Sequence, residues 1–403
     1  MKTCCLLSRS WLVPLTSRSG LICYGLSHGQ ICNSSLVTAF RISSSPYSNP
    51  SFKSPLHKYG IKKIPFPLLG NSCHWSLQLS SASSFEAPEP PKSRGQAVFP
   101  DIQFQHDAES GDEASEVSMR RNSDLDAVFV VTGASRGIGL QFVKSLTERT
   151  KGKIVSCCRS PSDAWDLQQF ANQHSDRIQV LPLDVEAQST IDTLALKIAQ
   201  TYGRVDALFN VAGILGDGKS TPGPERTVAA IDREWLEKSL AVNTIGPVML
   251  TKALSPLMRT TGRRSVMIDK PTDSNVSKDG SNKFEVDLPE GRLPTVIVNL
   301  SARVGSTSDN QLGGWYTYRL SKAALNSATK TLGLELKRQG TWIVALHPGT
   351  TNTSLSKPFQ KNVKEGRLFP VDFTVDSLLN LVESLCEKNT GGFYDWAGKA
   401  LPY

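Results

Sequence analysis

The stretch from residue 128 to residue 140 constrains the fold of this chain more than any other part of the sequence. A short apolar run, Val128 to Val131, leads directly into Thr-Gly-Ala-Ser-Arg-Gly-Ile-Gly and then into an amphipathic segment. This order predicts a strand, a glycine turn and a helix. Glycines let the backbone turn sharply and bring its N–H groups close to a phosphate at the helix N-terminus. Three glycines alone would also fit a turn without a ligand, but their place between strand and helix favours nucleotide binding.

The same turn resembles the cofactor turn of the short-chain dehydrogenase/reductase family, with the glycine spacing G-x-x-x-G-x-G. Further matches extend the resemblance over roughly residues 125–403, and the chain looks similar to the C-factor-like carbonyl reductases of that family. The resemblance implies hydride transfer between a nicotinamide cofactor and a carbonyl or alcohol carbon of a small molecule. The turn residues that it implies for the cofactor are Gly133, Ser135, Arg136, Gly137, Ile138 and Gly139.

Strand and helix patterns alternate along the rest of the chain. Apolar runs at 128–131, 154–158, 178–183, 205–209, 295–300 and 342–346 are separated by helical periodicities. This alternation predicts a single α/β domain with a doubly wound parallel sheet of the Rossmann type, covered on both faces. Residues 262–294 interrupt the rhythm with many Lys, Asp, Ser and Asn, and we expect a solvated surface insertion there; a substrate lid is the alternative.

The first 85 residues differ in composition from the remainder. They contain no Asp or Glu, many serines and eight Lys or Arg, as many charges as the net +8 of the whole chain. We expect an organelle transit peptide at 1–85. Frequent serine and scarce arginine favour the chloroplast, and the mitochondrion is the alternative. Residues 86–125 are polar and Pro-bearing, which predicts a disordered linker, and the reductase domain is expected at 126–403. Residues 1–122 are therefore predicted to be dispensable for folding.

Charge and cysteine usage exclude several classes of function. Without the leader, the chain carries as many basic as acidic residues, so its basic pI of about 9.0 does not indicate nucleic-acid binding. Five of the eight cysteines lie in the leader, and the others form no C-x-x-C pair, so neither a zinc site nor a disulfide framework is expected. No apolar run approaches the length of a membrane span. Members of the resembled family commonly form dimers or tetramers, which leaves a homo-oligomer open.

Two arginines bear on the choice of cofactor. Sites specific for NAD usually place a carboxylate after the second strand, whereas this strand ends Cys-Cys-Arg-Ser. In the resembled family, basic residues at the positions of Arg136 and Arg159 mark NADP(H), whose 2′-phosphate needs charge-assisted partners. Two solvated arginines without a ligand are the alternative. The remaining cofactor positions that the resemblance implies are Asp184, Val185, Asn210, Ala212, Gly213, Pro348, Gly349 and Thr353.

Tyr318 and Lys322 are the predicted catalytic pair. Four residues apart on a helix, they share one face, and a nearby ammonium favours the ionised form of a tyrosine. Tyr316 has Leu320 four residues later, which directs the choice to Tyr318. The resemblance adds Asn243 as the residue that holds a water of the proton relay.

One position departs from the resembled family. Its carbonyl-polarising serine usually lies three residues after the asparagine that ends the strand, where this chain has Ala302. Ser301 lies one place earlier and replaces the usual serine only if the backbone curls there, because strand neighbours point to opposite faces. This departure keeps a second function open: a redox-sensing or interaction protein that binds NADP but turns over little.

Overall fold

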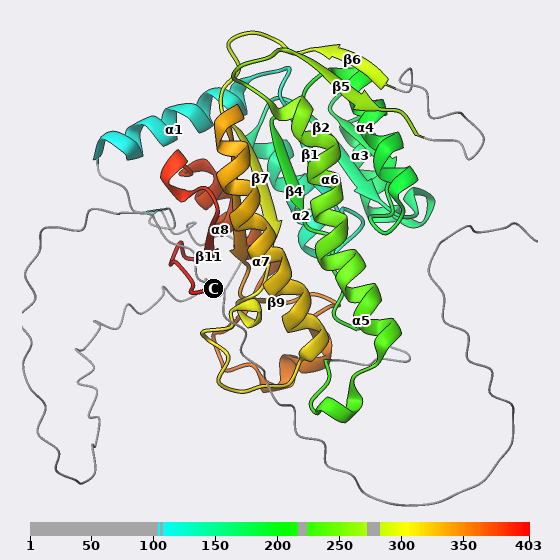
Figure 1. Ribbon diagram of the computed structural model, residues 1–403, viewed down its shortest axis with the longest axis vertical. Helices are drawn as coiled ribbons and strands as arrows, with labels where there is room; N and C mark the ends of the chain where they lie inside the picture. Colours follow the sequence, from blue (N-terminus) through cyan, green and yellow to red (C-terminus); the bar gives the residue numbers. More distant parts are fainter. Residues whose placement is uncertain (1–103, 105–107, 217–223, 272–282) are drawn as a thin grey trace, which may run out of the picture. The chain divides into compact units, whose positions relative to one another are not determined.

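The computed structural model of the protein describes residues 104, 108–216, 224–271 and 283–403 (Figure 1). The predicted transit peptide and most of the predicted linker lie outside these residues.

A parallel sheet forms the centre of the described part, with its strands in the order β11-β8-β7-β4-β1-β2-β3 (Figure 1). β1 pairs with β2 on one side and with β4 on the other, so the chain winds outward from the centre in both directions. This arrangement confirms the predicted doubly wound fold and leaves a crevice where the order reverses. β11 adds an edge strand that the sequence pattern does not predict. The strands are β1 (Val128–Thr132), β2 (Lys153–Cys158), β3 (Ile178–Pro182), β4 (Ala207–Asn210), β7 (Thr295–Leu300), β8 (Thr341–His347) and β11 (Gly392–Asp395).

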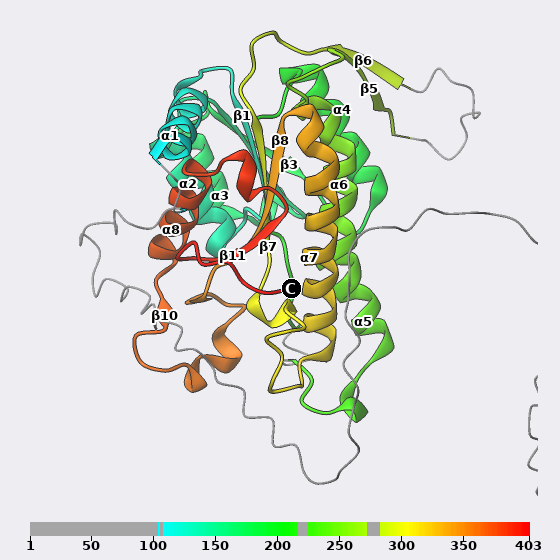
Figure 2. The ribbon, with the colours of Figure 1, turned by 60° about the vertical axis from the view of Figure 1, so that its left-hand side comes forward.

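Helices cover both faces of this sheet (Figure 2). One face carries α2 (Gly137–Arg149), α3 (Trp165–Gln173) and α8 (Val371–Glu383). The other carries α4 (Gln188–Tyr202), α6 (Gly246–Leu254) and α7 (Tyr316–Leu336), with α5 (Arg233–Leu240) running into α6 through a π-helical turn at Ala241–Ile245. The central strands are buried on both sides, which explains why β1 and β7 read as continuous apolar runs instead of alternating ones.

The described part of the insertion at 262–294 is not simply solvated. β5 (Ser265–Asp269) and β6 (Lys283–Asp287) pair antiparallel and pack against α4. Val266, Ile268 and Val286 are buried in the same apolar cluster as the α4 side chains. The expectation of a solvated insertion is therefore wrong for these residues, because one face of each strand contributes to the core. A further short pair joins β9 (Thr350–Thr351) and β10 (Leu368–Phe369).

The second half of the predicted linker is also ordered in the structure. α1 (Ala108–Ser123) packs against α8, and its Arg121 side chain is buried near Asp206 and Glu383. Ahead of the helix, Phe104 is buried, and the centroid of its ring lies 4.5 Å from that of the Tyr394 ring. The sequence pattern misses this helix because its contacts with the domain are largely polar. The predicted boundary at residue 126 is thus too late for the described fold.

Candidate active site

The glycine turn between β1 and α2 has the backbone that its sequence predicts. Gly133 and Gly137 adopt left-handed φ angles of +66° and +58°. A Cβ on Gly139 would lie 2.1 Å from the carbonyl oxygen of Gly133, so no larger residue fits there without moving the turn. Arg136 is the N-cap of α2, and no side chain caps this helix. The first-turn N–H groups of α2 therefore lack a side-chain acceptor, as a phosphate site requires.

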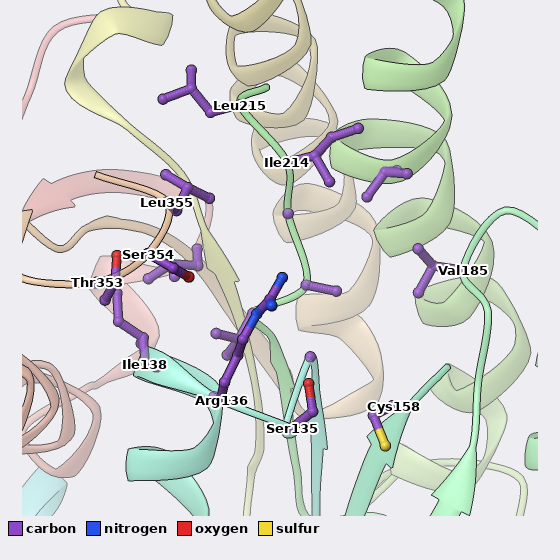
Figure 3. Close-up of a pocket in the computed structure, with 18 of the residues that line it drawn as sticks. Ser135, Arg136, Ile138, Cys158, Val185, Ile214, Leu215, Thr353, Ser354 and Leu355 are labelled. Atoms are coloured by element: carbon purple, nitrogen blue, oxygen red, sulfur yellow. The ribbon is translucent and has the colours of Figure 1, made fainter. Parts of the chain in front are cut away.

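A cavity of about 450 Å³ opens at the carboxyl edge of the sheet, beside this turn (Figure 3). Figure 3 shows the Arg136 side chain rising from the turn into the cavity, with Thr353 on one side and Cys158 and Val185 on the other. The cavity brings together residues from six of the parallel-strand ends. The predicted site residues that line it are Gly133, Ser135, Arg136, Gly137, Ile138, Gly139, Arg159, Asp184, Val185, Ala212, Gly213, Ser301, Tyr318, Lys322, Pro348 and Thr353.

Three predicted site residues lie outside the cavity lining. Asn210 is buried between strands, where its amide donates to Asn299 Oδ1 at 2.8 Å. Gly349 has a φ of +72°, and a Cβ on it would lie 2.5 Å from the Phe369 ring. Both residues shape the backbone beside the cavity, and the Asn210 side chain and the Gly349 Cβ position face the core. Their predicted contacts with a cofactor stay predictions. The third is Asn243, whose contacts are described below.

Arg136 and Arg159 have free guanidinium groups at the end of the cavity formed by the glycine turn and β2. Both side chains are exposed, and neither forms an ion pair with any described acidic residue. Surface arginines of this kind are good partners for a phosphate, which accepts bidentate hydrogen bonds from a guanidinium. The uncapped helix, the glycine turn and these two cations together fit a dinucleotide with an additional phosphate.

Tyr318 and Lys322 lie on α7 and line the same cavity. Lys322 Nζ lies 5.7 Å from the centroid of the Tyr318 ring and donates to the Leu300 carbonyl at 2.8 Å. Lys322 is only 4% exposed, and this burial lowers its pKa to about 8. Burial also raises the pKa of Tyr318 above its ordinary value. In this chain by itself, desolvation therefore outweighs the ammonium effect that the sequence analysis expects.

Asn243 lies inside the π-helical turn between α5 and α6, a distortion that is frequent at functional sites. Its Oδ1 accepts from the Ile214 N–H at 2.8 Å, and its Nδ2 donates to the Ile214 carbonyl at 2.9 Å. Nδ2 also donates to Ser321 Oγ on α7 at 3.1 Å. Asn243 thus joins the segment after β4, the π turn and α7. Both polar atoms of its side chain take part in these contacts, so we expect its backbone to be the group that holds a relay water.

Ser301 lines the cavity, whereas Ala302 does not. The Ser301 hydroxyl is 2% exposed and donates to Asn326 Oδ1 at 2.5 Å, one helical turn beyond Lys322. The Nδ2 atom of Asn326 is buried without a partner in the described structure. Ser301 therefore lines the cavity although the backbone does not curl at this position. Its hydroxyl is oriented by the hydrogen bond to Asn326 on α7.

The substrate end of the cavity is apolar, and sequence reasoning located it only by segment. The sequence predicts that loops at 215–224, 306–315 and 350–359 line the pocket. Described residues of the first and third of these segments do so, and residues 217–223 lie outside the described structure. The segment 306–315 contributes nothing to the lining. The apolar side chains at this end are Ile214, Leu215, Val242, Leu300, Leu355 and Pro358.

Metal and membrane features are absent from the residues that the structure describes. Within them, no group of three or more His, Cys, Asp or Glu is placed to hold a metal ion. None of the described helices combines the length and apolar character needed to cross a bilayer. His347, at the end of β8, is half-buried, and its buried Nδ1 atom has no partner among the described residues. Desolvation lowers its pKa to about 4, so it stays neutral near pH 7.

Known proteins share both the sequence pattern and the fold. The family model described as short chain dehydrogenase matches residues 127–270. The NADPH-bound carbonyl reductase from chicken fatty liver is 27% identical, with a TM-score of 0.55, over 69% of this chain and 99% of its own. The carbonyl reductase Sniffer of D. melanogaster is 28% identical, with a TM-score of 0.55, over 70% and 100%. A Rhodococcus 1-hydroxy-2-glutathionyl-2-methyl-3-butene dehydrogenase is 26% identical over 68% of this chain and 98% of its own length.

Proposed function

This chain belongs to the short-chain dehydrogenase/reductase family, and we propose that it is an NADP(H)-dependent carbonyl reductase for uncharged, largely apolar small molecules. One observation carries the proposal: a single cavity joins the phosphate-binding glycine turn to Tyr318 and Lys322. Four charged residues of the lining lie at the glycine turn and at the ends of β2 and β3. Lys322 is the charged residue at the substrate end, whose other side chains are largely apolar. The carbonyl reductases that resemble the chain support the same assignment.

The chain's own residues divide the chemistry between them. When bound, NADP(H) supplies or accepts the hydride. Tyr318 transfers the proton to or from the substrate oxygen, and Lys322 favours its ionised form and binds the nicotinamide ribose. Ser301 donates a hydrogen bond to the same oxygen once its hydroxyl turns from Asn326 towards the cavity. The buried strand ends exclude water and hold donor and acceptor in line, which accounts for much of the rate enhancement in such reactions.

The proposed cofactor preference depends on Arg136 and Arg159. A charge-assisted hydrogen bond contributes about 1.5–3 kcal/mol, so Arg159→Ala should weaken NADPH binding at least tenfold. NADH has no 2′-phosphate, and its affinity should hardly change. Titration of both cofactors by fluorescence measures the difference. Arg338→Ala, on an exposed arginine outside the cavity lining, is the matched control. Equal losses for NADPH and NADH in Arg159→Ala would contradict the assignment.

The alternative is an NADP-binding redox sensor or interaction protein with little turnover. The absence of a serine at position 302 is the observation behind it. Both functions predict tight NADPH binding, but only the reductase oxidises NADPH in the presence of carbonyl compounds. A panel of uncharged aromatic and aliphatic aldehydes, ketones and diones separates them. Tight binding without oxidation by any member of the panel would favour the sensor.

We also propose that residues 1–85 direct the protein to the chloroplast. The acid-free, serine-rich composition of this segment is the support. A fluorescent fusion of residues 1–85 should accumulate in plastids, and an in vitro import assay should yield a shortened product. Import into mitochondria alone would replace the plastid assignment, and a fusion that stays in the cytosol would remove the targeting role altogether.

A further inference from the structure

The catalytic helix α7 begins in an unusual way. Trp315 is its N-cap and has a φ of +57°, in the left-handed region that bulky residues rarely adopt. Its own side chain provides no cap. Such a conformation persists only where the surrounding structure holds it in place. Contacts from elsewhere in the chain must therefore fix the first turn of α7, which carries Tyr318.

Glu225 provides these contacts. It precedes α5 in the chain and is only 6% exposed. Its backbone carbonyl accepts from the Trp315 N–H at 2.5 Å. Its carboxylate accepts from the Thr317 N–H at 3.3 Å and from the Thr317 hydroxyl. A carboxylate from another segment thus caps this helix, in the place where a negative charge also interacts favourably with the helix dipole.

The residues on both sides of Tyr318 are anchored to the surrounding chain. Thr317 is held by Glu225, and Arg319 donates to the carbonyls of Gly314 at 2.9 Å and Val304 at 3.0 Å. The Arg319 contacts tie α7 to the segment that follows Ser301. Figures 1 and 2 both place the start of α7 at the same end of the folded unit as the segment leading into α5.

The cap also sets the aromatic surroundings of Tyr318. The Trp315 ring meets the Tyr318 ring edge to face, with centroids 6.3 Å apart, and the Phe359 ring in the same manner at 5.3 Å. Phe359 follows Pro358, which lines the cavity. Release of the Trp315 backbone would therefore move one aromatic neighbour of Tyr318 and loosen the first turn that orients its hydroxyl.

We propose that Glu225 is a positioning residue that fixes the first turn of α7 and thereby the orientation of Tyr318 towards the carbonyl carbon and oxygen of the substrate. The inference deepens the proposed reductase function and rests on it for its kinetic test. Glu225 acts through Thr317 and Trp315 and does not touch the substrate. Since displacements of about 1 Å at a reacting group can cost a hundredfold in rate, a cap of this kind affects turnover more than cofactor binding.

The test compares Glu225→Ala, Glu225→Gln and Thr317→Val in the full chain. Glu225→Ala should lower kcat for carbonyl reduction at least about tenfold. The NADPH dissociation constant should stay within about twofold, because the described hydrogen-bond partners of Glu225 are Trp315 and Thr317 and no residue of the glycine turn. Glu225→Gln keeps one acceptor oxygen and should restore part of the rate. Since Glu225 and Thr317 act through one contact, the double variant Glu225→Ala/Thr317→Val should be hardly slower than the slower single variant. Glu237→Ala, on an exposed glutamate of α5, is the matched control.

Hydrogen exchange gives a second readout that needs no turnover. In NADPH-bound Glu225→Ala, the amides of residues 315–319 should exchange at least about tenfold faster than in the wild type, and those of 330–336 should not change. Normal exchange at 315–319, a normal kcat in an active enzyme, or additive effects in the double variant would each overturn the positioning role. A wild type that oxidises no NADPH would overturn the reductase function, and the exchange result alone would then decide whether Glu225 holds α7.

Discussion

At the scale of single residues, Lys322 carries a charge in a position that does not favour one. It is nearly fully buried, its hydrogen-bond acceptor is the Leu300 carbonyl, and no described carboxylate forms an ion pair with it. Burial of an unpaired ammonium destabilises the folded protein and accounts for the lowered pKa. A residue that reduces stability in this way is retained for its chemistry, which agrees with the proposed role of Lys322.

Replacing this charge should stabilise the protein without cofactor. Below pH 8, Lys322 is protonated in both states, so the folded state bears the full cost of burying the charge. Between about pH 8 and 10.5 the folded state has lost this proton and the unfolded state has not, so the Lys322 contribution to stability rises with pH. Lys322→Met should therefore be more stable than the wild type at pH 7, by up to roughly 3 kcal/mol, and the gain should shrink above pH 8.

Urea unfolding of both proteins across pH 6–10 measures this difference. A methionine variant that is less stable than the wild type at pH 7 would mean that Lys322 holds the fold together, and its predicted catalytic role would lose this support.

Ser301 is the second residue-scale test. Because Ser301 lines the cavity and Ala302 does not, Ser301→Ala should lower kcat about tenfold, less than the full loss of an oxyanion donor because Tyr318 also donates to the substrate oxygen. Ala302→Ser should leave kcat nearly unchanged. Steady-state kinetics of both variants on one carbonyl substrate, with NADPH affinity as the control, distinguishes the two positions. A faster Ala302→Ser enzyme with a normal Ser301→Ala would mean that the strand keeps the usual register of the family.

At the scale of elements, six of the seven parallel strands could be predicted, whereas β11 and the hairpin β5–β6 could not. The central strands are short, rich in β-branched residues and buried on both faces, so their apolar runs stand out from the sequence. In the hairpin only alternate residues face the core, and the others are Ser, Met and Asp in β5 and Lys, Glu and Asp in β6. Its burial depends on contact with α4, which no local pattern reveals. The same reason applies to Asn210 and Gly349. The sequence predicts that each lies at the carboxyl end of a strand, but it does not predict that each faces the core and not the cavity.

The hairpin should contribute to stability and not to catalysis. Ile268 is 2% exposed and packs in the apolar cluster shared with α4. Ile268→Ala should therefore lower the free energy of unfolding by about 2–4 kcal/mol while kcat and the Michaelis constants stay unchanged. Met267→Ala, on the neighbouring exposed side chain, is the control and should cost little. A stability loss smaller than that of Met267→Ala would mean that the hairpin is a solvated insertion after all. A selective loss of substrate affinity would indicate that it acts as a substrate lid.

At the scale of the whole molecule, a polar network joins α1 to the remainder of the domain. The Asn122 side chain donates to Glu383 at 3.1 Å, and the Asn122 carbonyl accepts from the Lys151 N–H at 2.7 Å. Arg121 lies buried beside the same glutamate and Asp206. Phe104 and residues 108–123 therefore belong to the folded unit, although their composition resembles that of a linker.

Truncation at two points tests this assignment. Removal of residues 1–103 should leave the melting temperature nearly unchanged. Removal of residues 1–123 deletes α1, the Asn122 hydrogen bonds and the buried Arg121 beside Asp206. This loss should cost about 2 kcal/mol or more and lower the Tm by roughly 4–8 °C. Differential scanning calorimetry measures both. Equal melting temperatures for the two truncated proteins would mean that α1 does not stabilise the domain and belongs to the linker.

The central claim is that Tyr318 transfers the proton in an NADPH-dependent carbonyl reduction, and one measurement addresses it directly. Tyr318→Phe removes the hydroxyl and keeps the ring that packs against Trp315. NADPH oxidation with an active carbonyl substrate should fall at least about a hundredfold, with NADPH binding and melting temperature unchanged. Tyr316→Phe, two residues earlier on α7 and outside the cavity lining, should retain its activity. Near-normal turnover by Tyr318→Phe would contradict the account and place the acid on another residue.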